Sequence, residues 1–321
     1  MDSDARDSRF RRFLWNASER RPRMPVRLGI GAIVVVAAVF GTTAVIGGAV
    51  SGAESIPVLV AAWLAVQGIP GIVVLILAAV VDRRTVADLG LGVDRDWWID
   101  LGVGLGLGAT LMTGIFFVAL GMEWIRIEGW LALESNALDF PLAFAILLAF
   151  FLTAGVTEEL VVRGYLLTNL AEGLSGFVSH RVAIVFAVLA SSLVFGVGHG
   201  VNPNATSVST VGITIAGLLL AAGYVLTGEL ALPIGLHVAW NLFQGPVYGF
   251  AVSGVGFGVS LVDTAETGPD VMTGGAFGPE AGIIGIGAIL LGFALLRAYV
   301  RRRVGTVRVD PGLTVPTLRW R

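Results

Sequence analysis

Residues 141–166 read PLAFAILLAFFLTAGVTEELVVRGYL, an apolar run that continues into charged side chains with no turn between them. A transmembrane helix needs roughly 20 mostly apolar residues, and this stretch is long enough to meet that requirement. Ionisable groups inside a span are costly unless they pair or line a wet cavity, so they are candidates for function. The stretch therefore predicts a membrane-spanning helix that carries part of a functional site.

Seven further runs have the length and apolar character of membrane spans. They cover residues 28–50, 57–81, 101–122, 182–199, 208–228, 232–250 and 282–300. The composition agrees, because 55% of the residues are hydrophobic and only 14% are charged, against about 25% charged in ordinary globular chains. The sequence predicts an all-α, polytopic transmembrane helix bundle of about eight spans, with a membrane domain over residues 28–300.

The positions of the basic residues predict the orientation of this bundle. All 21 basic residues are arginine, and they concentrate in 1–27, in the 82–100 loop and after Arg297. Short cytoplasmic segments are enriched in such residues. We therefore expect both termini in the cytoplasm of a multi-pass cell-membrane protein, with 1–27 a flexible arginine-rich segment and 301–321 a cytoplasmic tail. The glycine-rich loop 251–281 is expected on the opposite side and to be flexible.

Several classes of function are excluded by composition. The chain has no cysteine, so it forms no disulfides and has no cysteine nucleophile. A formal net charge of -2 argues against nucleic-acid partners, which need a basic surface. The glycines at 102–106 lie inside a span, where close helix packing explains them better than a nucleotide site.

The charged end of the quoted stretch has a helical pattern. Glu159 and Arg163 are four residues apart with the acid first, which favours an ion pair on one helix face. This pair either fixes helix packing or takes part in catalysis. Glu158 points about 100° away, so it is free to face other partners.

Two other spans carry polar residues with the same spacing. Phe195 and His199 share one helix face in the span 182–199, and His237 and Asn241 share one in 232–250. Glu158 and His199 are nearly equidistant from the middle of the connecting hairpin, so antiparallel packing would bring them to similar depth if the first helix continues past Tyr165. The three faces can therefore converge on one cavity.

These groups suit amide hydrolysis. A buried carboxylate can act as a general base toward water, and hydrogen-bond donors can stabilise an oxyanion. We assign Glu158 as the base, His199 as a holder of the water, and His237 with Asn241 as donors. In the alternative scheme Glu158, His199 and His237 bind zinc, whose bound water is the nucleophile; the HExxH signature of soluble zinc proteases is missing.

At these residues the chain resembles the CAAX prenyl-protease and bacteriocin-processing (CPBP, or Abi) family of intramembrane proteases. The EExxxR, FxxxH and HxxxN motifs match in order over about residues 140–250. The resemblance implies an endopeptidase with the first glutamate as base. Family members include CAAX-tail proteases, and the family is commonly named as metalloprotease. The expected catalytic set is Glu158, Glu159, Arg163, His199, His237 and Asn241.

The sequence therefore predicts an intramembrane endopeptidase that cleaves a peptide bond in or near the bilayer by glutamate-activated water attack. Its expected partners are membrane lipids and a peptide or protein substrate that is membrane-bound or prenylated, with zinc as a candidate cofactor. Two alternatives stay open. One is a non-catalytic immunity or scaffold protein that binds a partner in the same cavity, and the other is a proton or ion transporter.

Overall fold

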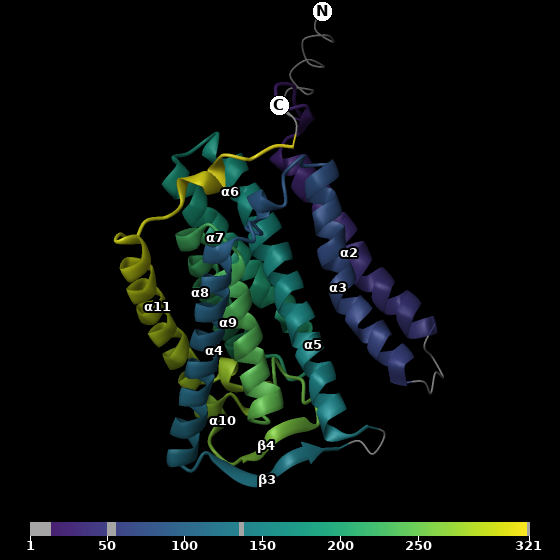
Figure 1. Cartoon of the computed structure of the whole chain (residues 1–321), viewed down its shortest axis with the longest axis vertical. Coiled ribbons are helices and arrows are strands. Elements are labelled where there is room, and N and C mark those ends of the chain that lie inside the picture. The colour runs from purple at the N-terminus through teal and green to yellow at the C-terminus, as the bar shows by residue number, and fades with distance from the viewer. Residues whose placement is uncertain (1–13, 50–55, 135–137, 320–321) are drawn as a thin grey trace, which may run out of the picture.

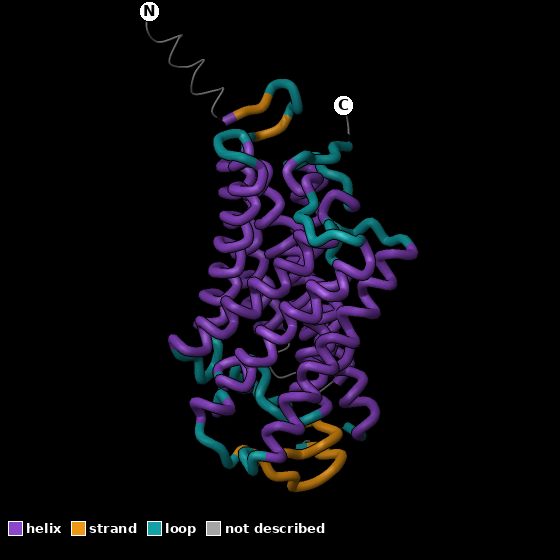
Figure 2. Tube along the Cα trace, turned by 90° about the vertical axis from the view of Figure 1, so that its left-hand side faces the viewer, coloured by secondary structure: helices purple, strands orange, loops and turns teal. Residues whose placement is uncertain are grey.

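The computed structural model describes residues 14–49, 56–134 and 138–319, and it is an all-α polytopic bundle (Figure 1). Within these residues, seven helices are long and apolar enough to cross a membrane. The strands of the described ranges lie at the two ends of the bundle (Figure 2). The chain is thus a multi-pass membrane protein. The seven are α2 (Met24–Ala49), α3 (Ile56–Val80), α4 (Arg95–Gly121), α5 (Phe140–Glu159) with its continuation, α7 (His180–Gly198), α8 (Ser207–Thr227) and α11 (Ile283–Val304).

The remaining predicted span, 232–250, is a shorter helix inside the bundle. It consists of α9 (Ala231–Leu242) and a π-helical segment, η4 (Phe243–Val247). α9 packs against α4, α5 and α8, and its residues 231–240 are all buried. A helix surrounded by protein is apolar on all sides, as a lipid-facing helix is. Hydropathy therefore identified the segment but could not reveal that it is too short to count among the seven long spans.

Glycines allow α4 to approach α9 at backbone distance. A Cβ atom on Gly108 would lie 2.8 Å from the backbone nitrogen of Trp240, whereas one on Gly106 would meet nothing within 4 Å. Gly104 makes a similar close approach to the backbone of Leu232 and Leu236. Small residues at such contacts are typical of membrane helix packing. The predicted packing role of the 102–106 glycines is confirmed at Gly104, and the contact fixes the position of α9.

Two segments pair into a sheet at the lower end of the bundle in Figure 1. Strand β3 (Ile125–Leu133) runs antiparallel to β4 (Val259–Glu266), with a register irregularity between Ile127 and Gly129. The glycine-rich loop expected over 251–281 therefore contains a strand, the short helix α10 (Asp270–Thr273) and two 3-10 turns. Backbone pairing with β3 is a long-range contact that the composition of the loop did not indicate.

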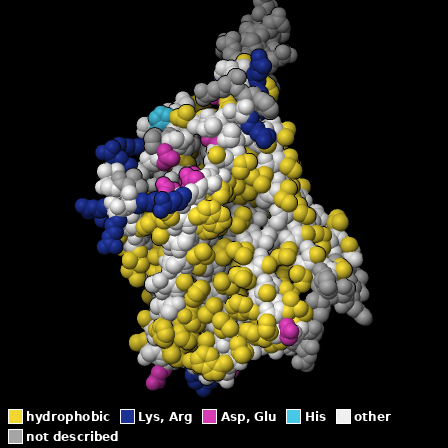
Figure 3. Space-filling model, viewed as in Figure 1, with side chains coloured by type: hydrophobic (Ala, Val, Ile, Leu, Met, Phe, Trp, Pro, Cys, Tyr) yellow, Lys and Arg dark blue, Asp and Glu magenta, His cyan; other side chains and the backbone are white. Residues whose placement is uncertain are grey.

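The opposite end contains the first and last described parts of the chain. Strands β1 (Trp15–Asn16) and β2 (Arg21–Pro22) form a hairpin, and the turn η7 (Pro311–Thr314) packs against α6 (Thr168–Ser175). Arginine side chains gather at this end in Figure 3, above a largely hydrophobic surface. Of the segment expected to be flexible, 1–13 lies outside the described residues and 15–27 forms the hairpin and the start of α2. The cytoplasmic placement of this end stays a prediction.

One carboxylate joins this end to the rest of the bundle. Glu172 on α6 accepts hydrogen bonds from Arg21 at 2.7 Å and from Arg27 at 2.9 Å, and it also pairs with Arg84. All three arginines are almost fully buried. Because α6 continues the helix that begins with α5, Glu172 connects the N-terminal hairpin and the 82–100 segment to that helix.

Candidate active site

The helix of the EExxxR motif runs without a break from α5 into a π-helical segment, η2 (Leu160–Leu167), and then into α6. Asp139 caps its start by accepting a hydrogen bond from the backbone nitrogen of Leu142. The unbroken run from α5 through η2 to α6 confirms the predicted continuation of the helix past Tyr165. π-Helical turns are rare and occur often at functional sites, and this one begins directly after Glu159.

Glu159 forms a buried ionic network behind the cavity. Its Oε1 atom lies 2.7 Å from Arg163 Nη1 and 2.8 Å from His237 Nδ1, and the side chains of Glu159 and Arg163 are 0% exposed. Arg163 also donates to the carbonyl of Gly217 at 3.1 Å, and its guanidinium lies 4.4 Å from the ring centre of Phe195. Because a carboxylate only accepts, His237 donates from Nδ1 and presents Nε2 to the other side.

Glu158 faces two imidazoles on different helices. Its Oε2 atom lies 3.8 Å from His237 Nε2 and 3.9 Å from His199 Nε2. Nδ1 of His199 lies 2.8 Å from the carbonyl oxygen of Phe195, so this ring also presents Nε2 to Glu158. The distances are too long for direct hydrogen bonds and suit a bridging water. Glu158 Oε2 is buried and has no hydrogen-bond partner among the described residues, although the side chain as a whole is 34% exposed.

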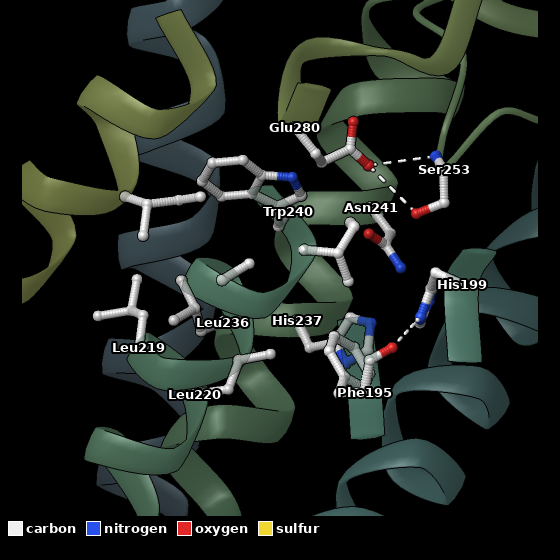
Figure 4. Close-up of a pocket in the computed structure, with 13 residues that line it drawn as sticks. Phe195, His199, Leu219, Leu220, Leu236, His237, Trp240, Asn241, Ser253 and Glu280 are labelled. Atoms are coloured by element: carbon white, nitrogen blue, oxygen red, sulfur yellow. Dashed lines mark hydrogen bonds between the residues drawn. The ribbon is translucent and has the colours of Figure 1, made fainter. Parts of the chain in front are cut away.

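These side chains open into a cavity of about 490 Å³. Its walls come from α3, α5, α7, α9 and the loop 252–257, and they combine aromatic and polar side chains. Asn241 lines it one helical turn beyond His237, as the spacing predicts. A smaller cavity of about 50 Å³ adjoins it and shares the two histidines and Asn241 (Figure 4). The larger cavity is lined by Gln67, Phe150, Phe151, Ala154, Glu158, Val162, Val194, Phe195, Gly198, His199, Asn202, His237, Asn241, Val252, Ser253, Val255 and Phe257.

The six predicted site residues divide into two groups. Four of them line the cavity: Glu158, His199, His237 and Asn241. The other two, Glu159 and Arg163, lie behind it, where they form the ion pair that their spacing predicts and hold His237. The predicted similarity in depth of Glu158 and His199 agrees with the 3.9 Å between their side chains.

Sequence reasoning missed the polar residues that other segments bring to the site. Gln67 is the single amide of α3 and lines the larger cavity. Ser253 lines both cavities, and Glu280 lines the smaller one. Burial raises the pKa of Glu280 from its usual value to about 7. The sequence offered no periodic pattern for these positions, because each is a lone polar residue in a different segment.

The side chains of Glu158, His199 and His237 are spaced more widely than the ligands of a zinc ion. Zinc takes tetrahedral ligands at about 2.0–2.2 Å, which places ligand atoms on the order of 3.4 Å apart. The Nε2 atoms of His199 and His237 lie 3.9 and 3.8 Å from Glu158 Oε2. Among the described residues, no group of three or more His, Asp and Glu side chains is arranged to hold a metal ion. These three side chains would have to approach one another to bind zinc. Zinc binding at this site stays a prediction.

A multi-pass helical protein with a carboxylate and two imidazoles around a cavity has the groups of a hydrolytic site. Residues 140–243 match the family model described as Rce1-like, type II CAAX prenyl endopeptidase Rce1-like. The resemblance inferred from the three motifs is thereby confirmed over this segment, which indicates a protease with a peptide or protein substrate. No curated protein and no solved structure matches the chain.

Proposed function

We propose that the chain is an intramembrane endopeptidase that hydrolyses a peptide bond in or near the bilayer with Glu158 as general base. The observation that carries the proposal is the Oε2 atom of Glu158. It has no hydrogen-bond partner within the described part of the chain and lies 3.8 and 3.9 Å from the Nε2 atoms of His237 and His199. A water molecule in this space would be within reach of the carboxylate and of both rings. The match to a CAAX endopeptidase family model supports the same reaction class.

The proposed reaction begins with a water held by Glu158 and His199. Glu158 removes a proton as the water oxygen attacks the peptide carbonyl carbon, and the carbonyl oxygen becomes an oxyanion. The amide of Asn241 donates a hydrogen bond to this oxygen, and so does Nε2 of His237 when both of its ring nitrogens carry protons. The tetrahedral intermediate then collapses, the C–N bond breaks, and Glu158 returns its proton to the leaving nitrogen.

The lining of the cavity favours a substrate that is bound to the membrane. Three phenylalanines, Phe150, Phe151 and Phe257, give it an apolar wall beside the polar residues. A CAAX substrate carries a prenylated cysteine followed by two aliphatic residues and a variable last residue. We propose a membrane-bound peptide of this kind, with cleavage after the modified cysteine.

The function can be tested by profiling the N-termini of peptides in membrane and secreted fractions of cells. Cells that carry the wild-type chain are compared with cells that carry Glu158→Gln or Glu128→Gln at matched abundance. Glu128 is an exposed residue of β3 (55% exposed side chain) and serves as the control. New termini that disappear only in Glu158→Gln would support proteolysis and name candidate substrates. Identical termini in all three, with folded protein, would favour the non-catalytic immunity or scaffold alternative.

The zinc scheme makes a separate prediction. If His199, His237 and Glu158 bind zinc, the purified active protein should contain about one zinc per chain, and His237→Ala should lose it. Elemental mass spectrometry on protein of measured specific activity checks this. Full activity with far less than one metal per chain would contradict the zinc scheme and leave Glu158 as the sole activator of water.

A further inference from the structure

We infer that Ser253 is a further substrate-binding residue, whose Oγ atom accepts a hydrogen bond from a backbone N–H of the peptide, and that Glu280 is the positioning residue that holds it. This inference rests on the proposed protease function. Ser253 belongs to the segment between η4 and β4, outside the region that matches the family model. It lines both the larger and the smaller cavity.

The position of Ser253 places its side chain within the site. In Figure 4 it lies beside Glu280 and above Asn241, on the side of the smaller cavity where His199 also lies. Its backbone carbonyl accepts a hydrogen bond at 3.0 Å from the side chain of Asn202, which follows His199 on the same segment and lines the larger cavity. Ser253 is therefore tied to the segment of a predicted catalytic residue.

Glu280 holds Ser253 from the other side. One carboxylate oxygen, Oε1, accepts from the backbone nitrogen of Ser253 at 3.1 Å and from its hydroxyl at 3.3 Å. The other, Oε2, accepts from Gln244 Nε2 at 2.6 Å. Glu280 and Gln244 are buried. A buried carboxylate is costly unless its oxygens find donors, and here two of the three donors belong to Ser253, a residue of the cavity wall.

The backbone of Ser253 belongs to a tight turn that fixes where its side chain points. Ser253 and Gly254 are the two central residues between Val252 and Val255, whose backbones exchange two hydrogen bonds. The φ angle of Ser253 is +47°, in the left-handed region that residues other than glycine rarely adopt. Turns of two residues with positive φ at both central positions are the common connection of a tight hairpin, and Gly254 has a φ of +87°. A glycine at position 253 would adopt this φ angle without strain, yet the chain carries a serine there, with its hydroxyl at the cavity.

The chemistry of the hydroxyl determines what it can bind. A serine has one hydrogen to donate and two lone pairs. When Glu280 is ionised and accepts this hydrogen, Oγ can only accept from a group in the cavity. Peptide N–H groups are the donors that every peptide substrate carries. Asn241 supplies a donor for a peptide carbonyl, so Ser253 and Asn241 together would bind an extended peptide through one N–H and one C=O.

The test uses a synthetic S-farnesyl peptide that ends in Cys-Val-Ile-Met, with the protein in proteoliposomes. Each backbone N–H after the cysteine is replaced in turn by an ester oxygen, except at the scissile bond. We expect wild type to cleave one ester analogue with a kcat/KM about three- to tenfold below that of the amide peptide. Ser253→Ala and Ser253→Gly should lower kcat/KM for the amide peptide by a similar factor, through a higher KM. Both variants should cleave that ester and the amide peptide with equal kcat/KM.

The variants separate hydrogen bonding from folding. Ser253→Gly removes the hydroxyl while relieving the strained φ angle, so a loss shared by both Ser253 variants does not come from instability. Glu280→Gln keeps an acceptor for Ser253 and should retain the amide preference, whereas Glu280→Ala should abolish it. Ser207→Ala, at the exposed start of α8, is the control with unchanged kinetics.

Two outcomes would contradict the inference in different ways. If wild type cleaves the amide peptide and both Ser253 variants keep the full ester profile, Ser253 does not accept a substrate N–H, and the proposed protease function stands. If the folded wild-type protein cleaves the amide peptide no faster than Glu158→Gln, the proposed function fails. The role of Ser253 then fails with it.

Discussion

Glu158→Gln is expected to lower the rate of peptide cleavage by about 10²–10⁴-fold, the usual contribution of a positioned general base. The amide has nearly the volume of the carboxylate but cannot take a proton from water. Because Glu158 Oε2 has no hydrogen-bond partner among the described residues, the substitution removes no observed bond from this atom. The measurement is kcat for the S-farnesyl peptide in proteoliposomes, with helical content and thermal melting recorded on the same preparations.

Glu128→Gln provides the matched comparison for this variant. It makes the same chemical change on an exposed side chain of β3, whose nearest ionic partner, Arg126, is 3.9 Å away. Its kcat should equal that of wild type. Cleavage by Glu158→Gln within about twofold of wild type would remove Glu158 from the role of base and would require another group to activate the water.

Arg163→Met is expected to reduce the free energy of unfolding by about 3–5 kcal/mol, because it leaves the Glu159 carboxylate buried without its cationic partner. Both side chains are 0% exposed, and the guanidinium also donates to the carbonyl of Gly217. Methionine fills a similar length but carries no donor. Denaturant titration in micelles, followed by circular dichroism, measures the change.

Two further variants isolate the ionic contribution. Arg126→Met, at an arginine that is 69% exposed, should leave the unfolding free energy unchanged, since exposed ion pairs contribute little. Adding Glu159→Leu to Arg163→Met removes the unpaired charge and should restore most of the lost stability. Activity should stay low in this double variant, because His237 Nδ1 no longer has a carboxylate to orient it. Unchanged stability in Arg163→Met would show that the pair is not needed for packing.

The sequence predicted those parts of the fold and site that follow from one helix at a time. Run length located the spans, the i to i+4 spacing predicted the Glu159 and Arg163 pair, and the helical repeat predicted that Glu158 points about 100° away from it. The equal depth of Glu158 and His199 followed from helical rise and a hairpin of known length. These are local rules, and each needs only a few neighbouring residues.

What the sequence could not predict depends on contacts between distant segments. The pairing of β3 with β4 joins two loops more than a hundred residues apart in the chain. The composition of a loop does not indicate which distant segment it pairs with. The second bond of Glu159, to His237 Nδ1, gives that glutamate its role in orienting the ring, whereas its spacing indicated only the arginine. Glu280 and Ser253 reach the site because the turn Pro279–Ala281 packs against α8 and α11, and Glu280 in turn binds Ser253. These are contacts between distant segments that the sequence does not indicate.

The arginine-bound Glu172 has a mechanical consequence for the helix that carries Glu158. That helix is fixed by Glu159 beside the cavity and again by Glu172 at the arginine-rich end of the bundle. Because this helix is held at two levels, it cannot rotate about its long axis without breaking one of the two attachments. The angle at which Glu158 meets the imidazoles is therefore set in part by Arg21, Arg27 and Arg84, which lie at the far end of the molecule and outside the segment that matches the protease family.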